Sequence, residues 1–170
     1  MSRLLIILGF IFIGLESRLI PHPPNFTSIN AIAFFSAFYL GNWQLSLVTV
    51  LSTVFISDIF IGFYTTMPFV YLCYGFIILT GCYFKEMSLY RIPLISLCNS
   101  FLFFMVSNFG VWVGDSLYPK TVTGLSLCYI AGIPFLLNQI LGDIAYGILL
   151  FGYVHVCKNY FQKENLGFPV

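Results

Sequence analysis

The sequence predicts an all-α integral membrane protein in which residues 1–170 form one transmembrane domain, a bundle of about six transmembrane helices. Two observations on composition lead to this fold class: 59% of the residues are hydrophobic, and only 8% are charged. Soluble domains carry roughly 25% charged residues, and a soluble fold of this length could not bury so much apolar surface. The third observation is that the apolar residues form segments near the roughly 20 residues that cross a bilayer.

The first span is expected at about residues 4–20. Glu16 and Arg18 follow its apolar core and no A-x-A-like cleavage site is present, so we expect a retained helix rather than a cleaved signal peptide. The second span begins near residue 29 and ends at the Gly-Asn-Trp break at 41–43, which makes it short. The other spans are expected at about residues 44–62, 68–84, 92–113 and 134–157. Residues 121–133 fit an outer helix, a re-entrant segment or an early start of the last span.

The positive charges predict the orientation. With the N-terminus in the cytoplasm, the residues on the inner side are Arg3, Lys85, Arg91, Lys158 and Lys163. Only Arg18 and Lys120 then lie outside, which is the excess of inner positive charge typical of membrane proteins. We therefore expect a multi-pass protein of the cytoplasmic (inner) membrane with both termini in the cytoplasm. The segments expected outside are residues 21–30, 63–68 and 113–124.

Several classes of function are disfavoured. The net charge of +1 lacks the dense basic face that nucleic acid requires. The five cysteines are scattered without a CxxC pair, and we interpret them as packing residues. His22 and His155 are expected on opposite membrane faces, so no metal site or other cofactor is predicted. No phosphate-binding loop is present, so any ATP must be hydrolysed by another chain.

Polar side chains gather toward the outer ends of four expected helices. They are Glu16 and Arg18; Asp58; Asn108, Trp112 and Asp115; and Gln139, Asp143 and Tyr146. The last two groups each share one helical face. Because such side chains are costly in lipid and usually face a bundle interior or a wet cavity, we predict one cavity that opens outward. The alternatives are pairing of Glu16 with Arg18, bracing of a helix end by Asp58, and an interface position for Trp112.

Residues 21–30, Pro-His-Pro-Pro-Asn-Phe-Thr-Ser-Ile-Asn, connect the first two spans. Proline restricts its own backbone and disfavours helix at the residue before it, so this segment keeps a fixed shape. We interpret it as a preordered rim or lid that presents His22, Asn25 and Thr27 to the cavity. The alternative is a stiff connector that only ends one helix and begins the next.

Two stripes of small residues follow. Ala33, Ala37 and Gly41 are spaced four apart on the short second span. The next span carries a comparable stripe at Ser46, Thr49, Thr53 and Ser57. Small residues allow close helix approach, either inside the protein or against a partner membrane subunit.

Four stretches resemble an uncharacterised family of small bacterial membrane proteins. They are residues 18–41, 57–63, 107–129 and 133–143, of which Pro-His-Pro-Pro-Asn-Phe and Asn-Phe-Gly-Val-Trp are the most specific pieces. That family distantly resembles the substrate-binding S components of energy-coupling factor (ECF) transporters. These are six-helix proteins that capture vitamins, vitamin precursors or metal ions from outside. The resemblance implies a coupling membrane subunit and two cytoplasmic ATPases as partners. In S components an Ala-x-x-x-Ala pattern in the first helix contacts the coupling subunit, and here Ala33 and Ala37 carry it on the second span.

The leading hypothesis is therefore a solute-binding or uptake protein without enzymatic activity. Asp58 and Asp143 would be acceptors or counter-charges, and Trp112 would stack on a ring. The residues predicted to bind the solute are Glu16, Arg18, His22, Asn25, Asp58, Asn108, Trp112, Gln139, Asp143 and Tyr146. One alternative is a non-transporting membrane subunit or assembly factor that works through its small-residue stripes. Another is an intramembrane enzyme acting on lipid, with Glu16, Asp58 or Asp143 as acid or base.

Overall fold

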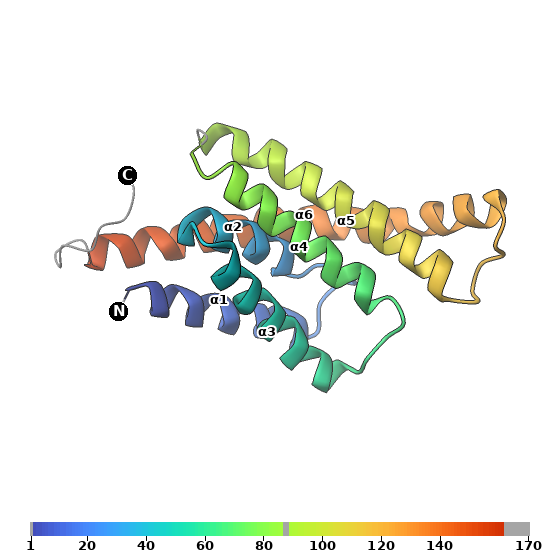
Figure 1. Cartoon of the computed structure of the whole chain (residues 1–170), viewed down its shortest axis with the longest axis horizontal. Coiled ribbons are helices and arrows are strands. Elements are labelled where there is room, and N and C mark those ends of the chain that lie inside the picture. Colours follow the sequence, from blue (N-terminus) through green and yellow to red (C-terminus); the bar gives the residue numbers. More distant parts are fainter. Residues whose placement is uncertain (1, 87–88, 162–170) are drawn as a thin grey trace.

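The computed structural model describes residues 2–86 and 89–161, and this part of the chain is all-helical (Figure 1). Its elements are α1 (Ser2–Leu19), α2 (Ile29–Leu40), α3 (Trp43–Ile61), α4 (Met67–Tyr83), the 3₁₀ turn η1 (Leu89–Arg91), α5 (Ile92–Gly114) and α6 (Val122–Phe161). The expected all-α class with about six helices is thus confirmed within the described residues. Lys163 and the rest of the C-terminal segment lie outside them.

Three of these helices are long and apolar enough to cross a membrane. They are α3, α5 and residues 122–157 of α6. α2 and α4 are also apolar but have only 12 and 17 residues, respectively. The expectation that all six helices span the membrane therefore stays a prediction.

The helices alternate in direction along one long axis (Figure 1). The start of α1, the α2–α3 turn and the turn after α4 lie toward one end of the bundle. The α3–α4 and α5–α6 loops lie at the opposite end. Two of the segments expected outside, the α3–α4 and α5–α6 loops, therefore lie at the same end of the molecule, whereas the third, residues 21–30, does not reach that end.

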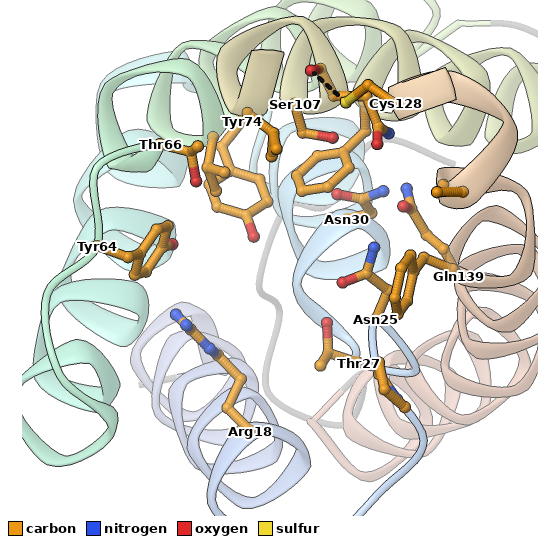
Figure 2. A pocket seen from close by; sticks show the side chains of 18 of the residues that line it. Arg18, Asn25, Thr27, Asn30, Tyr64, Thr66, Tyr74, Ser107, Cys128 and Gln139 are labelled. Carbon is orange, nitrogen blue, oxygen red and sulfur yellow. Dashed lines mark hydrogen bonds between the residues drawn. The ribbon is translucent and has the colours of Figure 1, made fainter. Parts of the chain in front are cut away.

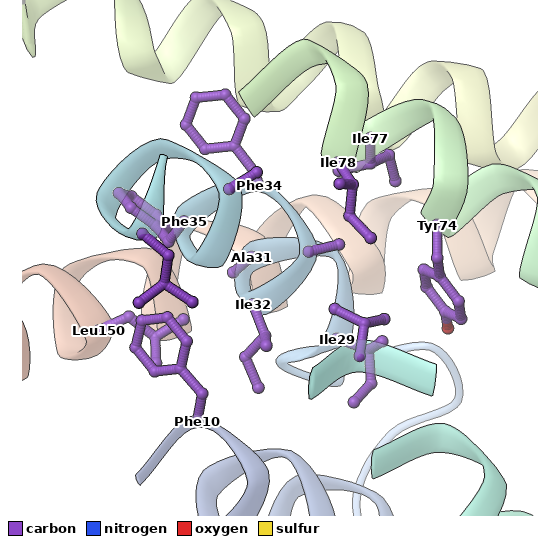
Figure 3. Packing of buried hydrophobic residues seen from close by; sticks show 14 of the residues in the cluster. Phe10, Ile29, Ala31, Ile32, Phe34, Phe35, Tyr74, Ile77, Ile78 and Leu150 are labelled. Carbon is purple, nitrogen blue, oxygen red and sulfur yellow. The ribbon is translucent and has the colours of Figure 1, made fainter. Parts of the chain in front are cut away.

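The short helix α2 forms the core. Ten of its 12 residues are buried, and it contacts each of the other five α-helices. A helix that is apolar on all sides is stable only when it is surrounded. Figure 3 shows Phe34 and Phe35 of α2 among apolar side chains from neighbouring helices, including Phe10 of α1, Ile78 of α4 and Leu150 of α6.

The small residues of α2 serve this internal packing. Ala33 and Ala37 have no exposed surface, and a Cβ atom added to Gly81 of α4 would collide with the carbonyl oxygen of Phe34. Ala33 and Ala37 are therefore inside the protein and not on a surface open to a partner, and α4 packs closely on Phe34 and Ala37. Gly41 instead ends α2 in the left-handed conformation (φ 62°), and its N–H donates to the Ala37 carbonyl at 3.0 Å.

The second stripe is also internal. Ser46, Thr49, Thr53 and Ser57 are buried, and each hydroxyl donates to a backbone carbonyl three or four residues earlier in the chain. A Cβ atom at Gly14 of α1 would collide with the methyl group of Thr53. The stripe therefore allows α1 to approach α3 closely. Of the two roles considered for it, packing inside the protein and contact with a partner subunit, the structure shows the first.

Helix α6 is continuous from Val122 to Phe161, so residues 121–133 are the early start of the last helix rather than a separate or re-entrant segment. Pro134 lies inside it. At 1.5 Å per residue, its 40 residues extend roughly 60 Å, about twice the hydrocarbon thickness of a bilayer. α6 therefore extends well beyond one membrane crossing.

The loop between α1 and α2 lies deep in the molecule because α2, at 12 residues, is only about 18 Å long. It packs on the middle of α6, where a Cβ atom at Gly142 would be 3.2 Å from the Phe26 Cα and the Thr27 nitrogen. The Asn138 amide of α6 also donates to the Pro24 carbonyl at 3.1 Å. The loop is therefore fixed against α6 at this depth.

Candidate functional site

A cavity of about 550 Å³ lies between the α1–α2 loop and helices α4, α5 and α6 (Figure 2). Tyr64 and Thr66 of the α3–α4 connection and Tyr118 of the α5–α6 loop line it, so it reaches the end of the bundle where these loops lie. At its other extreme it reaches Asn30 and Asp143. The cavity therefore extends from one end of the bundle toward its middle.

Residues from separate predicted groups meet in this cavity. Six of the ten predicted binding residues line it, namely Arg18, His22, Asn25, Asn108, Gln139 and Asp143. Thr27, which was also expected in the rim, lines it as well. The convergence of distant polar side chains on one cavity is thus present for these positions.

The other four predicted residues do not line the cavity. Glu16 is exposed, and Asp58 is buried behind Arg18. The Tyr146 ring packs on Phe26 with a centroid distance of 5.9 Å. None of these three side chains therefore lines the cavity in which it was expected from the sequence.

Trp112, the fourth, holds the α5–α6 loop. Its indole N–H donates to the Pro119 carbonyl at 2.9 Å, and the Lys120 ammonium lies 5.7 Å from its ring centroid. The ring therefore contacts its own loop and does not line the cavity.

Arg18 belongs to a buried cluster at the cavity wall. Its guanidinium donates to Asp58 Oδ1 at 2.6 Å, and the Tyr71 hydroxyl donates to Asp58 Oδ2 at 2.8 Å. Because both oxygens of the fully buried Asp58 are occupied, this carboxylate holds Arg18 in place and has no free oxygen for a ligand. Figure 2 shows the guanidinium pointing toward the space between Tyr64 and Tyr74. Burial raises the pKa of the Tyr64 hydroxyl, so Tyr64 stays a neutral hydrogen-bond donor at physiological pH.

The opposite end of the cavity, its floor, is formed by three helices. Asp143 Oδ2 accepts hydrogen bonds from the Ser100 hydroxyl at 2.6 Å and from the Asn30 amide at 3.3 Å. The Gln139 amide nitrogen lies 3.5 Å from the Ser100 carbonyl oxygen, to which it donates. These contacts tie α2, α5 and α6 together around a buried acid.

Two oxygens of this floor have no partner in the described part of the chain. They are Asp143 Oδ1 and Gln139 Oε1, on side chains that are each only 3% exposed. A buried polar atom without a hydrogen bond costs roughly 1–3 kcal/mol, and more when it carries charge. Both side chains line the cavity, which makes these two oxygens the candidate acceptors for a bound molecule.

Asn30, Tyr74 and Ser107 also line the cavity and were not selected from the sequence. Asn30 had a usable signature, because it is an amide at the start of an otherwise apolar helix, where such groups are costly. Tyr74 and Ser107 had none, because tyrosine and serine are common in membrane helices without any binding role.

A second cavity, of about 660 Å³, follows α5 and α6 below the floor, with Phe35 of α2 at its side. Most of its lining is apolar, and Ser100 and Asp143 border it. Asp143 therefore lies between a polar cavity on one side and an apolar one on the other. Within the described residues, no group of three or more His, Cys, Asp or Glu side chains could hold a metal ion.

Fold and cavity together define a class of protein: an all-helical bundle with helices of membrane-crossing length and a cavity that extends from one end toward the middle and has several polar side chains in its lining. Over residues 1–164 the chain matches the Family of unknown function (DUF6580), and it belongs to that family. No curated protein and no solved structure is significantly similar to the chain. The expected membership of an uncharacterised family is thus confirmed, whereas the likeness to S components stays a prediction.

Proposed function

We propose that the protein is a multi-pass protein of the cytoplasmic membrane that captures a small polar solute in the 550 Å³ cavity, in the manner of an ECF S component. The observation that carries this proposal is the convergence of polar side chains from the α1–α2 loop, α2, α5 and α6 on one space, among which Asn30, Gln139 and Asp143 are buried. Its volume lies within the roughly 300–1,000 Å³ typical of small-molecule sites. Its lining also has the usual character of such sites, with aromatic side chains and a few placed polar groups.

The direction of capture follows from charge. The cavity reaches the α3–α4 and α5–α6 loops, whereas Lys85 and Arg91 belong to the connection at the opposite end of the bundle. Cytoplasmic loops of membrane proteins carry the excess of lysine and arginine. We therefore propose that the cavity opens to the outside and that both termini are cytoplasmic.

The proposal includes all six helices in the bilayer. α2 is too short to cross it alone, and the α1–α2 loop would complete that crossing. Non-helical backbone is tolerated at membrane depth where it is buried in protein or lines a wet cavity. Packing of the loop on Gly142 and its residues in the cavity lining both support this arrangement.

Uptake against a gradient needs an energy source. Because the sequence has no phosphate-binding loop, we propose that other chains hydrolyse ATP, as the coupling subunit and two ATPases do for S components. Ala33 and Ala37 are fully buried, so such a subunit would contact a different surface of this protein.

Thermal unfolding in detergent tests solute capture. A panel of vitamins, vitamin precursors and small amines is added to the wild type and to Ser107→Trp, whose indole would fill part of the cavity. A solute at 100 times its Kd stabilises by about 2.7 kcal/mol, or roughly 5–11 °C for a chain of this length. We expect Ser107→Trp to lose this shift.

The matched control is Ser116→Trp, which makes the same substitution at an exposed serine in the α5–α6 loop. It should keep the shift of the wild type. Solute capture in this cavity is contradicted if no compound of the panel stabilises the wild type, or if a compound stabilises Ser107→Trp equally.

A further inference from the structure

The floor of the cavity contains a pair of adjacent hydrogen-bond acceptors that lack donors. Gln139 and Asp143 are four residues apart and so lie on one face of α6. Both are also bound to Ser100 of α5, Asp143 through the serine hydroxyl and Gln139 through the serine carbonyl. This shared contact orients the two side chains and leaves Asp143 Oδ1 and Gln139 Oε1 unpaired.

Asp143 also has no cationic partner among the hydrogen bonds of the described residues. Arg18, which also lines the cavity, is already paired with Asp58 at 2.6 Å, so its positive charge is compensated there. Asp143 contacts only neutral groups, an amide and a hydroxyl. A buried carboxyl group stays ionised only when it is paired and hydrogen-bonded. A ligand that carries positive charge and donates hydrogen bonds would supply both conditions at this site.

The size and walls of the cavity indicate an organic cation rather than a metal ion. Hard metal ions need about six or more oxygen ligands, whereas the unpaired oxygens here number two. The cavity is far larger than an ion, and its walls include the rings of Tyr74, Phe103 and Phe135. Tyr74 and Phe103 also contact each other, with a centroid distance of 5.7 Å. Such rings accommodate an aromatic body and attract a cationic group through their π faces.

We infer that the solute is a small aromatic amine whose primary ammonium group donates hydrogen bonds to Asp143 Oδ1 and Gln139 Oε1. This inference depends on the proposed function, because it names the chemical class of the captured solute. The ammonium supplies the two donors and the positive charge that the floor lacks. The aromatic body extends from the floor between the rings of the cavity wall.

Asp143→Asn is the sharpest perturbation. The asparagine keeps one oxygen to accept from Ser100 and Asn30, and it places an NH₂ group where Oδ1 now lies. The acceptor becomes a donor and the charge is lost, with little change in shape. Gln139→Met is the second variant, which removes the other free acceptor together with the long amide hydrogen bond to the Ser100 carbonyl. Asp115→Asn, the same substitution at an exposed loop position, is the matched control.

The probes are 2-phenylethylamine, its alcohol 2-phenylethanol and its N,N,N-trimethyl derivative. The amine combines a positive charge with N–H donors. The alcohol has a hydrogen-bond donor without charge, and the trimethyl derivative has the charge without a donor. Thermal shifts are measured in nanodiscs of phosphatidylcholine, a lipid whose headgroup has no primary amine. For the wild type and Asp115→Asn we expect binding of the amine to be roughly ten- to hundredfold tighter than that of either analogue. Asp143→Asn should lose this preference, and Gln139→Met should weaken amine binding by about tenfold.

The outcomes separate this inference from the proposed function. If the alcohol or the trimethyl compound binds the wild type as well as the amine, or if both variants keep the amine preference, the ammonium site is wrong while solute capture stands. The same holds if vitamins of the first panel bind in the cavity and the amine does not. If phosphatidylethanolamine stabilises the protein and no soluble compound does, the ammonium belongs to a lipid, and both proposals are contradicted.

Discussion

The Arg18–Asp58 pair offers a direct test of how the cavity wall is held. Asp58→Asn preserves the shape of the side chain and removes its charge. In the wild type both Asp58 oxygens are engaged, by the Arg18 guanidinium at 2.6 Å and by the Tyr71 hydroxyl at 2.8 Å. The asparagine keeps one acceptor oxygen, so the principal loss is the negative charge opposite Arg18.

The size of the effect follows from burial. Removing one partner of a buried ion pair typically costs about 3–5 kcal/mol, because the remaining charge stays buried without compensation. Asp58 is fully buried, but Arg18 retains 12% exposure at the cavity, where water can solvate it. The lower end, about 3 kcal/mol, is therefore expected. For a domain of this length it corresponds to a fall in Tm of roughly 6–12 °C.

The assay is thermal unfolding in detergent of Asp58→Asn, the double variant Arg18→Met/Asp58→Leu, and the exposed control Asp115→Asn. The double variant leaves no unpaired charge, so we expect it to recover about 2 kcal/mol of the loss, although Tyr71 still lacks its acceptor. Asp115→Asn should change stability by less than about 0.5 kcal/mol. A loss below about 1 kcal/mol in Asp58→Asn, or a double variant less stable than the single one, would refute the reasoning.

Two further predictions concern packing and orientation. Gly81→Ala should destabilise the protein by about 1–3 kcal/mol in the same assay, because its Cβ atom would collide with the backbone of α2. Gly75→Ala in the same helix meets no atom within 4 Å and should be neutral or stabilising by about 0.5–1 kcal/mol, so equal effects would contradict the α2–α4 packing. For orientation, Ser116→Cys should react with a membrane-impermeant maleimide in intact cells above the wild-type background, whereas Glu86→Cys should react only after permeabilisation. The reverse pattern would place the cavity mouth in the cytoplasm.

The positions of α1 to α5 were largely predictable from the sequence, whereas the start of α6 was not. Apolar segments separated by proline, glycine or charged residues located α1 to α5 to within a few residues. Residues 121–133 stayed open, because a polar-flanked apolar stretch before Pro134 is compatible with a break or with a continuous helix. Only the backbone of α6 decides between them.

The cavity was predictable in outline because charged and amide groups in apolar helices are costly and tend to meet. The ion pair between Arg18 and Asp58 at its wall was not predictable. Arg18 and Asp58 are separated by 40 residues, and nothing in the sequence indicates that they bind each other rather than a solute. The stripe at Ala33 and Ala37 was ambiguous for a similar reason, since close helix packing requires small residues on an internal and an external surface alike.

The length of α2 is the structural cause of the site. A helix of full crossing length in this central position would fill the bundle from end to end and leave no room at its centre. Because α2 has only 12 residues, the Pro-rich loop and the start of the helix lie deep in the molecule, and the space above them is bounded by α4, α5 and α6. The same arrangement brings Asn30, near the start of α2, against Asp143. The cavity and its polar floor therefore have one origin, and a change that lengthens α2 would be expected to remove both.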